Sequence, residues 1–256
     1  MPNPELDVVR LGWLLPEWPA PPWVRACTTT RGGGVSEASF ASLNLAEHVG
    51  DNPKHVAVNR LRLLEALHLQ AKPLWLNQVH GTTVVDAATV KPACEADASF
   101  ASRPEIVCAV LTADCLPVLL CDGDGTRVAA VHAGWRGILA GVIENAVRAL
   151  HCSGSQLLAW LGPAIGPRAF EVGNEVRDAF VAADPQAALA FEPAAGGRWL
   201  ADIYMLARQR LASVHVTAVY GGNWCTVNDA ERFYSYRRDG VTGRMASLIW
   251  LDMSRK

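Results

Sequence analysis

Apolar and polar positions alternate along the chain in blocks that predict a mixed α/β domain. Apolar runs bounded by Gly, Pro and Asp predict strands at 24–30, 116–121, 127–132, 157–161, 214–220 and 245–251. Apolar positions recur at helical spacing over 55–69, 138–150 and 199–211, a further helix is expected from about Asn174, and 74–88 is expected to form strand, turn and strand. No composition break divides the chain, so we expect one α/β domain (α+β type, mixed sheet) over 1–256, with 1–24 as a Trp- and Pro-rich lead-in.

The stretch 112–137, TADCLPVLLCDGDGTRVAAVHAGWRG, is the one around which the chain is organised. Its two apolar runs are joined by Asp-Gly-Asp-Gly at 122–125, which predicts a β-hairpin that brings Cys115 and His132 to one place. A glycine-rich turn then leads into the helix expected over 138–150. Free backbone N–H groups and the helix dipole at such a turn favour an anion.

Composition excludes several classes of partner. The chain of 256 residues is 50% hydrophobic with a formal net charge of -2, and its cations are scattered, so neither nucleic acid nor an acidic membrane surface is expected to bind. No run approaches the roughly 18 apolar residues of a membrane span, and the first residues lack the pattern of a secretory leader. We therefore expect a soluble, cytoplasmic protein.

Seven cysteines without a CxxC pair fit a reducing compartment better than a disulfide scaffold. Five of them are expected to be structural: Cys27, Cys108 and Cys121 in apolar runs, and Cys94 and Cys152 in loops. Cys115 and Cys225 remain as candidates for chemistry.

His80, Cys115 and His132 each stand at the end or edge of a predicted strand. Catalytic zinc takes three protein ligands and keeps a fourth position open, and one thiolate with two imidazoles suits zinc or copper rather than magnesium or calcium. The spacing matches no compact zinc signature, so three unrelated buried residues is the competing interpretation. Arg31, followed by three glycines, is a candidate anion cradle.

Five motifs carry a resemblance over the chain from about residue 27 to its end: NQVHG (77–81), TADCLPVLL (112–120), AAVHAGWRG (129–137), LGPAIGP (161–167) and FYSYRRDGVTGR (233–244). The chain resembles the YfiH/YlmD family, also named laccase-domain proteins or multicopper polyphenol oxidases. The resemblance implies a YfiH-like fold, related in shape to a bacterial toxin with a Cys-His site. It also implies a zinc-dependent enzyme that phosphorolyses adenosine, inosine, guanosine and methylthioadenosine and deaminates adenosine, with a nucleoside and phosphate as its small-molecule partners.

The resemblance also implies residue roles. His80, Cys115 and His132 correspond to the family's metal ligands, and Arg31 to a residue on the phosphate side of the pocket. Arg136, near the glycine-rich turn, is a further phosphate candidate. Three more positions are of interest in the site: Gln78 near the bend before His80, Glu171 as a helix cap or weak candidate for the acid in deamination, and Ala164, where the family often has cysteine.

Three other functions stay open. A multicopper oxidase needs many histidines, commonly in HxH pairs, and this chain has seven histidines and no such pair. A metal-free cysteine hydrolase would use Cys115 as nucleophile and His132 or His80 as base, and a peptidoglycan-precursor editing enzyme belongs with it. A purely structural metal site is disfavoured because structural zinc is usually closed by four ligands.

Overall fold

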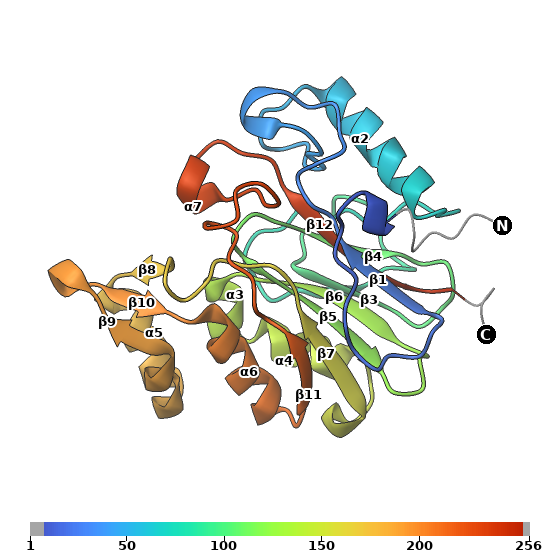
Figure 1. Ribbon diagram of the computed structural model, residues 1–256. Coiled ribbons are helices and arrows are strands. Elements are labelled where there is room, and N and C mark those ends of the chain that lie inside the picture. Colours follow the sequence, from blue (N-terminus) through green and yellow to red (C-terminus); the bar gives the residue numbers. More distant parts are fainter. Residues whose placement is uncertain (1–7, 253–256) are drawn as a thin grey trace.

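The computed structural model describes residues 8–252, and a mixed six-stranded sheet lies at its centre (Figure 1). The strand order is β11-β7-β5-β6-β3-β2, with parallel pairing at both edges and antiparallel pairing between. The strands are β2 (Val84–Asp86), β3 (Ala98–Ala101), β5 (Leu116–Asp122), β6 (Val128–Ala133), β7 (Leu157–Leu161) and β11 (Ala218–Gly221).

A second, antiparallel sheet packs on one face of the first, and helices cover the other face (Figure 1). The second sheet has the order β1 (Val24–Thr28), β12 (Met245–Leu251), β4 (Cys108–Thr112). The covering helices are α3 (Trp135–Ala140), α4 (Val142–Ala149) and α6 (Ile203–Ser213), while α2 (Pro53–Ala66) packs on the outer face of the second sheet. The chain thus stacks helix, sheet, sheet and helices in four layers.

The remaining elements lie around these layers. A small antiparallel sheet consists of β8 (Glu171–Val172), β10 (Trp199–Ala201) and β9 (Phe191–Pro193), next to α5 (Asn174–Ala183). The short helix α7 (Tyr236–Asp239) precedes β12. Short 3₁₀ helices are η1 (Ala38–Phe40), η2 (Gly154–Gln156), η3 (Pro185–Ala190) and η4 (Ala195–Gly197).

The central hairpin is buried on both faces, which explains why its sequence is a continuous apolar run. In β5, alternate side chains point to opposite faces: Leu116, Val118 and Leu120 face the helices, while Leu119 and Cys121 face the second sheet. The register pairs Leu116 with Ala133, so Cys115 lies beside the end of β6. The structure confirms the predicted hairpin.

Several sequence predictions are confirmed. The strands expected at 157–161 and 245–251 have those bounds as β7 and β12, and α5 begins at Asn174. The amphipathic helix expected over 55–69 is α2, shifted by two or three residues: Asn52 caps its first turn by accepting from the backbone N–H of Lys54. The strand expected at 24–30 is β1, which ends at Thr28.

Other boundaries were wrong, each for a local reason. The helix expected over 138–150 is two helices, because Gly141 takes a left-handed conformation (φ 98°) between α3 and α4. The helix expected from 199 begins only at Ile203, since 199–201 pairs as strand β10 and Asp202 caps α6. The strand expected over 214–220 is limited to Ala218–Gly221.

The segment expected to form strand, turn and strand over 74–88 differs from the expectation as well. The first strand predicted within 74–88 is reduced to isolated bridges of Leu74 with Cys108 and Asn77 with Glu95, and only β2 forms. The lead-in is clamped by aromatic packing: Trp13 is buried, and Trp18 and Trp23 pack partly buried on the core, while 1–7 lie outside the described residues. Among residues 8–252 no helix is long and apolar enough to cross a membrane.

Candidate metal centre and its cavity

His80, Cys115 and His132 come from three separate segments and meet at one point. His80 lies in the loop before β2, Cys115 in the turn between β4 and β5, and His132 on β6. Their ligand atoms all lie within 4.8 Å of one another, and Cys115 Sγ is 3.7 Å from His80 Nε2. His132 is buried, Cys115 is half-buried and His80 is exposed, so the cluster is open to solvent on one side.

The donor set fits a zinc ion. Zn–S and Zn–N bonds of about 2.3 and 2.0–2.1 Å at a tetrahedral centre place sulfur and nitrogen about 3.5 Å apart, close to the separation of Cys115 and His80. His132 Nδ1 contacts Asp97 at 2.8 Å, which leaves Nε2 as the ring nitrogen free for a metal. Three protein ligands with one open side is the pattern of a catalytic rather than a structural zinc site.

Asp97 orients two of the three candidate ligands at once. Its fully buried carboxylate accepts hydrogen bonds from the backbone N–H groups of Val79, His80 and Gly81 and contacts His132 Nδ1. The Asp97 carbonyl also accepts from His132 N at 2.7 Å. Burial alone would raise the pKa of Asp97, but the bonds from His132, Gly81 and His80 outweigh it and hold that pKa below its usual value.

The loop that carries His80 is further fixed by Gln78. The Gln78 side-chain amide donates to Leu111 O at 2.8 Å and accepts from Leu111 N at 2.7 Å, as a neighbouring strand would. His80 itself has φ 61°, in the left-handed region that few non-glycine residues adopt. The hydrogen bonds to Asp97 and Leu111 therefore hold a loop conformation that is costly in isolation.

Gly134 leaves room for the cluster. A Cβ atom at this position would lie 2.9 Å from His80 Cδ2 and 3.2 Å from Cys115 Sγ. Its φ of -67° is open to any residue, so space rather than conformation requires glycine here. The glycine of the motif VHAGWRG thus allows close approach of the candidate metal-binding side chains.

Cys115 and His132 form a strongly coupled pair. Burial opposes the thiolate, but the charge and hydrogen bond of His132, together with His80, outweigh it and lower the pKa of Cys115 to about 6. Burial likewise opposes imidazolium, yet the Cys115 thiolate and Asp97 raise the pKa of His132 to about 9. Without a metal, the pair is a thiolate and an imidazolium at neutral pH.

The cluster lies in the wall of a cavity of about 470 Å³, within the range of small-molecule sites. Its apolar wall includes Leu111, Trp135, Ile165, Phe170, Ile203 and Tyr236. Its polar wall adds four charged or imidazole side chains that were not predicted from the sequence: His48, Asp114, Arg237 and Arg244. Asp114 belongs to the motif TADC, and Arg237 and Arg244 belong to FYSYRRDGVTGR, so membership of these motifs could have pointed to them. No feature of the sequence pointed to His48.

The surroundings of His48 change its pKa, and those of Asp114 fix the position of its carboxylate. Burial first, and then the charges of Arg244 and Arg60, lower the pKa of His48, so its imidazole is neutral at pH 7. The Asp114 carboxylate accepts from Thr226 Oγ1 and from Arg237 N, both at 2.6 Å. Asp114 has φ 97°, so these bonds fix a strained backbone position next to Cys115.

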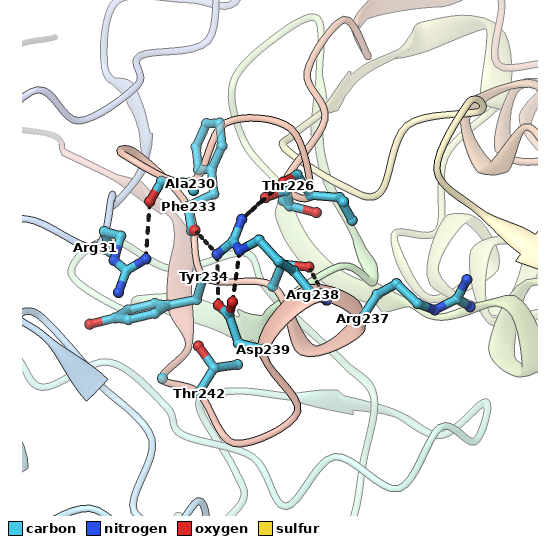
Figure 2. Close-up of polar contacts among 12 residues, drawn as sticks. Arg31, Thr226, Ala230, Phe233, Tyr234, Arg237, Arg238, Asp239 and Thr242 are labelled. Atoms are coloured by element: carbon cyan, nitrogen blue, oxygen red, sulfur yellow. Dashed lines mark hydrogen bonds and ion pairs between the residues drawn. The ribbon is translucent and has the colours of Figure 1, made fainter. Parts of the chain in front are cut away.

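The other predicted site residues divide into two groups. Gln78 and Arg136 line the cavity. Arg31 does not: its guanidinium donates to Ala41 O and Ala230 O and lies over the Tyr234 ring (Figure 2). Glu171 also lies outside the lining, exposed on β8 and paired with Arg198 at 3.2 Å.

The remaining cysteines are not part of the cluster. Cys27, Cys108 and Cys121 are buried as expected, and Cys94 and Cys152 lie in loops. Cys225 Sγ accepts from Gly166 N at 3.3 Å and lines a separate cavity of about 450 Å³.

The chain is similar to known proteins over nearly all of its length. A family model described as multi-copper polyphenol oxidoreductase laccase matches residues 25–252. A purine nucleoside phosphorylase of Pseudomonas aeruginosa is 60% identical over 241 residues, covering 94% of this chain and 98% of the relative. Purine nucleoside phosphorylase YfiH of Escherichia coli is 56% identical over 239 residues, covering 93% and 98%.

Solved structures are also similar to this chain over nearly all of its length. A Neisseria meningitidis protein matches with a TM-score of 0.91 and 52% identity, over 94% of this chain and 99% of that one. YlmD from Geobacillus stearothermophilus matches with a TM-score of 0.88 and 30% identity, over 93% and 96%. The expected α/β fold with mixed sheets is thereby confirmed.

We expect Asp97→Asn to weaken zinc binding by roughly 10- to 100-fold, because the amide replaces an acceptor oxygen shared by the His80 loop and the His132 ring. Zinc affinity is measured by competition with a chromophoric chelator. The matched control is Asp122→Asn, which changes another buried aspartate at the far end of the same hairpin. Equal affinity in both variants and wild type would contradict the role of Asp97.

Gly134→Ala is expected to lower zinc affinity about tenfold or more, since the added methyl group displaces His80 or Cys115. The same competition assay applies. Gly123→Ala is the control, because a Cβ there meets its nearest neighbour, Gln156 O, at an ordinary 3.6 Å. Wild-type affinity in Gly134→Ala would show that the close approach does not matter.

In metal-stripped protein, iodoacetamide should modify Cys115 with a rate that rises through a midpoint near pH 6, the pKa of about 6 given to this thiol by its imidazole neighbours. The thiolate forms above that pH, so the rate is low at pH 5 and levels off by pH 7. Mass spectrometry identifies the modified residue, and Cys115→Ser must abolish the fast phase. A midpoint above pH 8, as for an ordinary thiol, would contradict the coupling.

Proposed function

The chain belongs to the YfiH/YlmD family, whose model is described as multi-copper polyphenol oxidoreductase laccase, and on that premise we propose that it is a zinc-dependent purine nucleoside phosphorylase. The proposed nucleosides are adenosine, inosine, guanosine and methylthioadenosine, with inorganic phosphate as the second substrate. Deamination of adenosine is proposed as a second reaction of the same site. Relatives at 56–60% identity that carry the name purine nucleoside phosphorylase support the proposal.

The observation that carries the proposal is the open CysHis₂ cluster in the wall of a cavity that has both aromatic and cationic sides. Trp135, Phe170 and Tyr236 offer ring faces and edges suited to a purine base. Arg136, at the start of α3, offers charge for phosphate. A site for an uncharged aromatic nucleoside and a small anion needs both kinds of wall.

In phosphorolysis, a phosphate oxygen forms a bond to C1′ of the ribose as the bond from C1′ to the purine nitrogen breaks. The electron pair of that bond and the proton from phosphate go to the purine, and the products are the free base and ribose 1-phosphate. His80, Cys115 and His132 would hold the zinc ion, which would act as a Lewis acid toward developing negative charge. The cavity's arginines hold and orient phosphate, and its aromatic wall holds the base.

Deamination calls for water in place of phosphate and for an acid near the purine amino group. Glu171, the candidate from sequence, is not among the residues that line the cavity. Apart from the cluster and the three arginines, the titratable groups that line it are His48, Asp114 and Tyr236. The Asp114 carboxylate is already engaged by Thr226 and Arg237, and the lowered pKa of His48 makes it a poor proton donor, so the Tyr236 hydroxyl is the group to test for that role.

A second candidate function is supported by one specific contact. Asp97, His132 and Cys115 form a chain in which the aspartate contacts His132 Nδ1 at 2.8 Å and the ring carries the thiolate's counter-charge. This is the arrangement of a cysteine hydrolase, in which Cys115 is the nucleophile and His132 its base. Peptidoglycan precursors are the substrate class to examine under this alternative.

The proposal is tested by incubating zinc-loaded protein of known metal content with adenosine, with and without phosphate, and by quantifying the products. We expect ribose 1-phosphate only with phosphate, in an amount equal to adenine plus hypoxanthine, because inosine from the second reaction is itself a substrate for phosphorolysis. Cys115→Ala should lower turnover by roughly a hundredfold or more, because it removes a metal ligand.

Two treatments separate this proposal from the cysteine hydrolase. A chelator should abolish turnover and zinc should restore it, whereas a metal-free hydrolase would retain activity in chelator and lose it on alkylation of Cys115. Consumption of oxygen with a phenol, measured on the copper-loaded protein, would instead favour an oxidase. If zinc-loaded wild type leaves all four nucleosides unchanged, the proposal is wrong.

A further inference from the structure

Three arginines that line the cavity share one local arrangement. The guanidinium of each lies over an aromatic ring of the same cavity wall. The pairs are Arg136 with Trp135 at 4.3 Å, Arg237 with Phe170 at 5.6 Å and Arg244 with Tyr236 at 5.8 Å. Ring faces attract and order a cation without neutralising it.

Backbone carbonyls add support for two of the three, Arg237 and Arg244. Arg237 Nη1 donates to Glu171 O at 3.0 Å, and Arg244 Nη1 donates to Thr242 O at 2.8 Å and Gly243 O at 3.0 Å. Within residues 8–252, no carboxylate forms an ion pair with any of the three arginines. They are therefore held in place with their charges available to a ligand.

Arg238, which follows Arg237 on α7, makes different contacts. It makes a two-pronged contact with the Asp239 carboxylate at 2.8 and 2.7 Å and donates to the carbonyls of Thr226 and Phe233. Figure 2 shows Arg238 turned into this network while Arg237 points away from it. Arg238 thus fixes the segment, and Arg237 is the arginine that α7 presents to the cavity.

The negative groups in the cavity do not cancel this charge. Asp114 uses one oxygen for Thr226 Oγ1 and the other for the backbone N–H of Arg237, so it positions α7 beside the cluster. The Cys115 thiolate is committed to the two histidines or to a metal. Three arginines against these two anions leave the cavity positive, and more so when it holds Zn²⁺.

We propose that Arg237 and Arg244, together with Arg136, form the subsite for inorganic phosphate, and that Arg31 has no part in it. This inference rests on the proposed function, in which the nucleoside is neutral and phosphate is the one anionic substrate. Arg136 and the segment that carries Arg237 and Arg244 lie far apart in the sequence, and planar guanidinium groups can bind a phosphate through several N–H donors at once. The aromatic partners order the guanidinium groups in the free enzyme, which reduces the ordering required on binding.

The test is a steady-state analysis in which phosphate and nucleoside are varied separately. For Arg237→Ala, whose side chain is exposed, we expect the KM for phosphate to rise roughly tenfold or more, since one charged hydrogen-bonding partner is lost. The KM for inosine should stay within about twofold. Arg237→Lys should recover part of the loss, because it keeps the charge but not the planar fork.

Arg198→Ala is the matched control: it removes an exposed arginine near Glu171 that does not line the cavity. Thermal shift with inorganic phosphate on zinc-loaded protein gives a readout besides activity. Phosphate should raise the Tm of wild type and Arg198→Ala, and raise that of Arg237→Ala and Arg244→Lys clearly less. Circular dichroism and zinc content establish that each variant is folded and loaded.

The outcomes separate this inference from the function on which it rests. If wild type forms ribose 1-phosphate but the KM for phosphate is unchanged in Arg237→Ala and Arg244→Lys, the subsite is elsewhere and the inference is overturned. An equal rise in both KM values would also overturn it, since the arginines would then shape the whole cavity. If wild type forms no ribose 1-phosphate but phosphate still raises its Tm in an Arg237-dependent way, the proposed function fails while the anion site stands.

Discussion

The carboxylate of Asp97 accepts hydrogen bonds from the loop that carries His80 and contacts the ring of His132, and the geometry of the cluster depends on these contacts. A fully buried carboxylate is expensive unless its lone pairs are satisfied. Here four donor groups satisfy it, and all four belong to segments that supply candidate metal ligands. The need to satisfy Asp97 therefore links fold stability to the placement of His80 and His132.

The layered fold supplies the remaining constraints on the site. The two sheets bury both faces of the β5–β6 hairpin, which fixes its register and places Cys115 beside Gly134 at the open end. The second sheet brings the turn after β4 to the same point, and β12 leads from the arginine-bearing segment back into the core. Segments more than a hundred residues apart thus form one cavity wall. Asp114 joins two of them directly through its bond to Arg237 N.

Local sequence signals predicted much of this architecture. The hairpin, β7, β12 and the start of α5 follow from apolar runs and turn residues, whose effects act over a few positions. The predicted ends of helices were wrong where pairing with a distant strand or a single glycine set the boundary. Examples are β10, which pairs where a helix was expected, and Gly141, which separates α3 from α4. The three metal-ligand candidates were predicted from residue type, from their places at the ends of expected strands and from the family resemblance, and the structure brings their ligand atoms within 4.8 Å of one another. Asp97 was not, because a buried carboxylate that serves backbone N–H groups leaves no periodic signal, and Arg31 could not be placed because a glycine loop does not reveal which cavity it faces.

The proposed function requires that His80, Cys115 and His132 bind one zinc ion and leave a fourth position open. X-ray absorption spectroscopy at the zinc edge of protein loaded with one equivalent tests this most directly. We predict one sulfur at about 2.3 Å and two or three nitrogen or oxygen atoms at about 2.0–2.1 Å, with the sulfur lost in Cys115→Ala. A zinc shell with no sulfur, or with two or more, would contradict it.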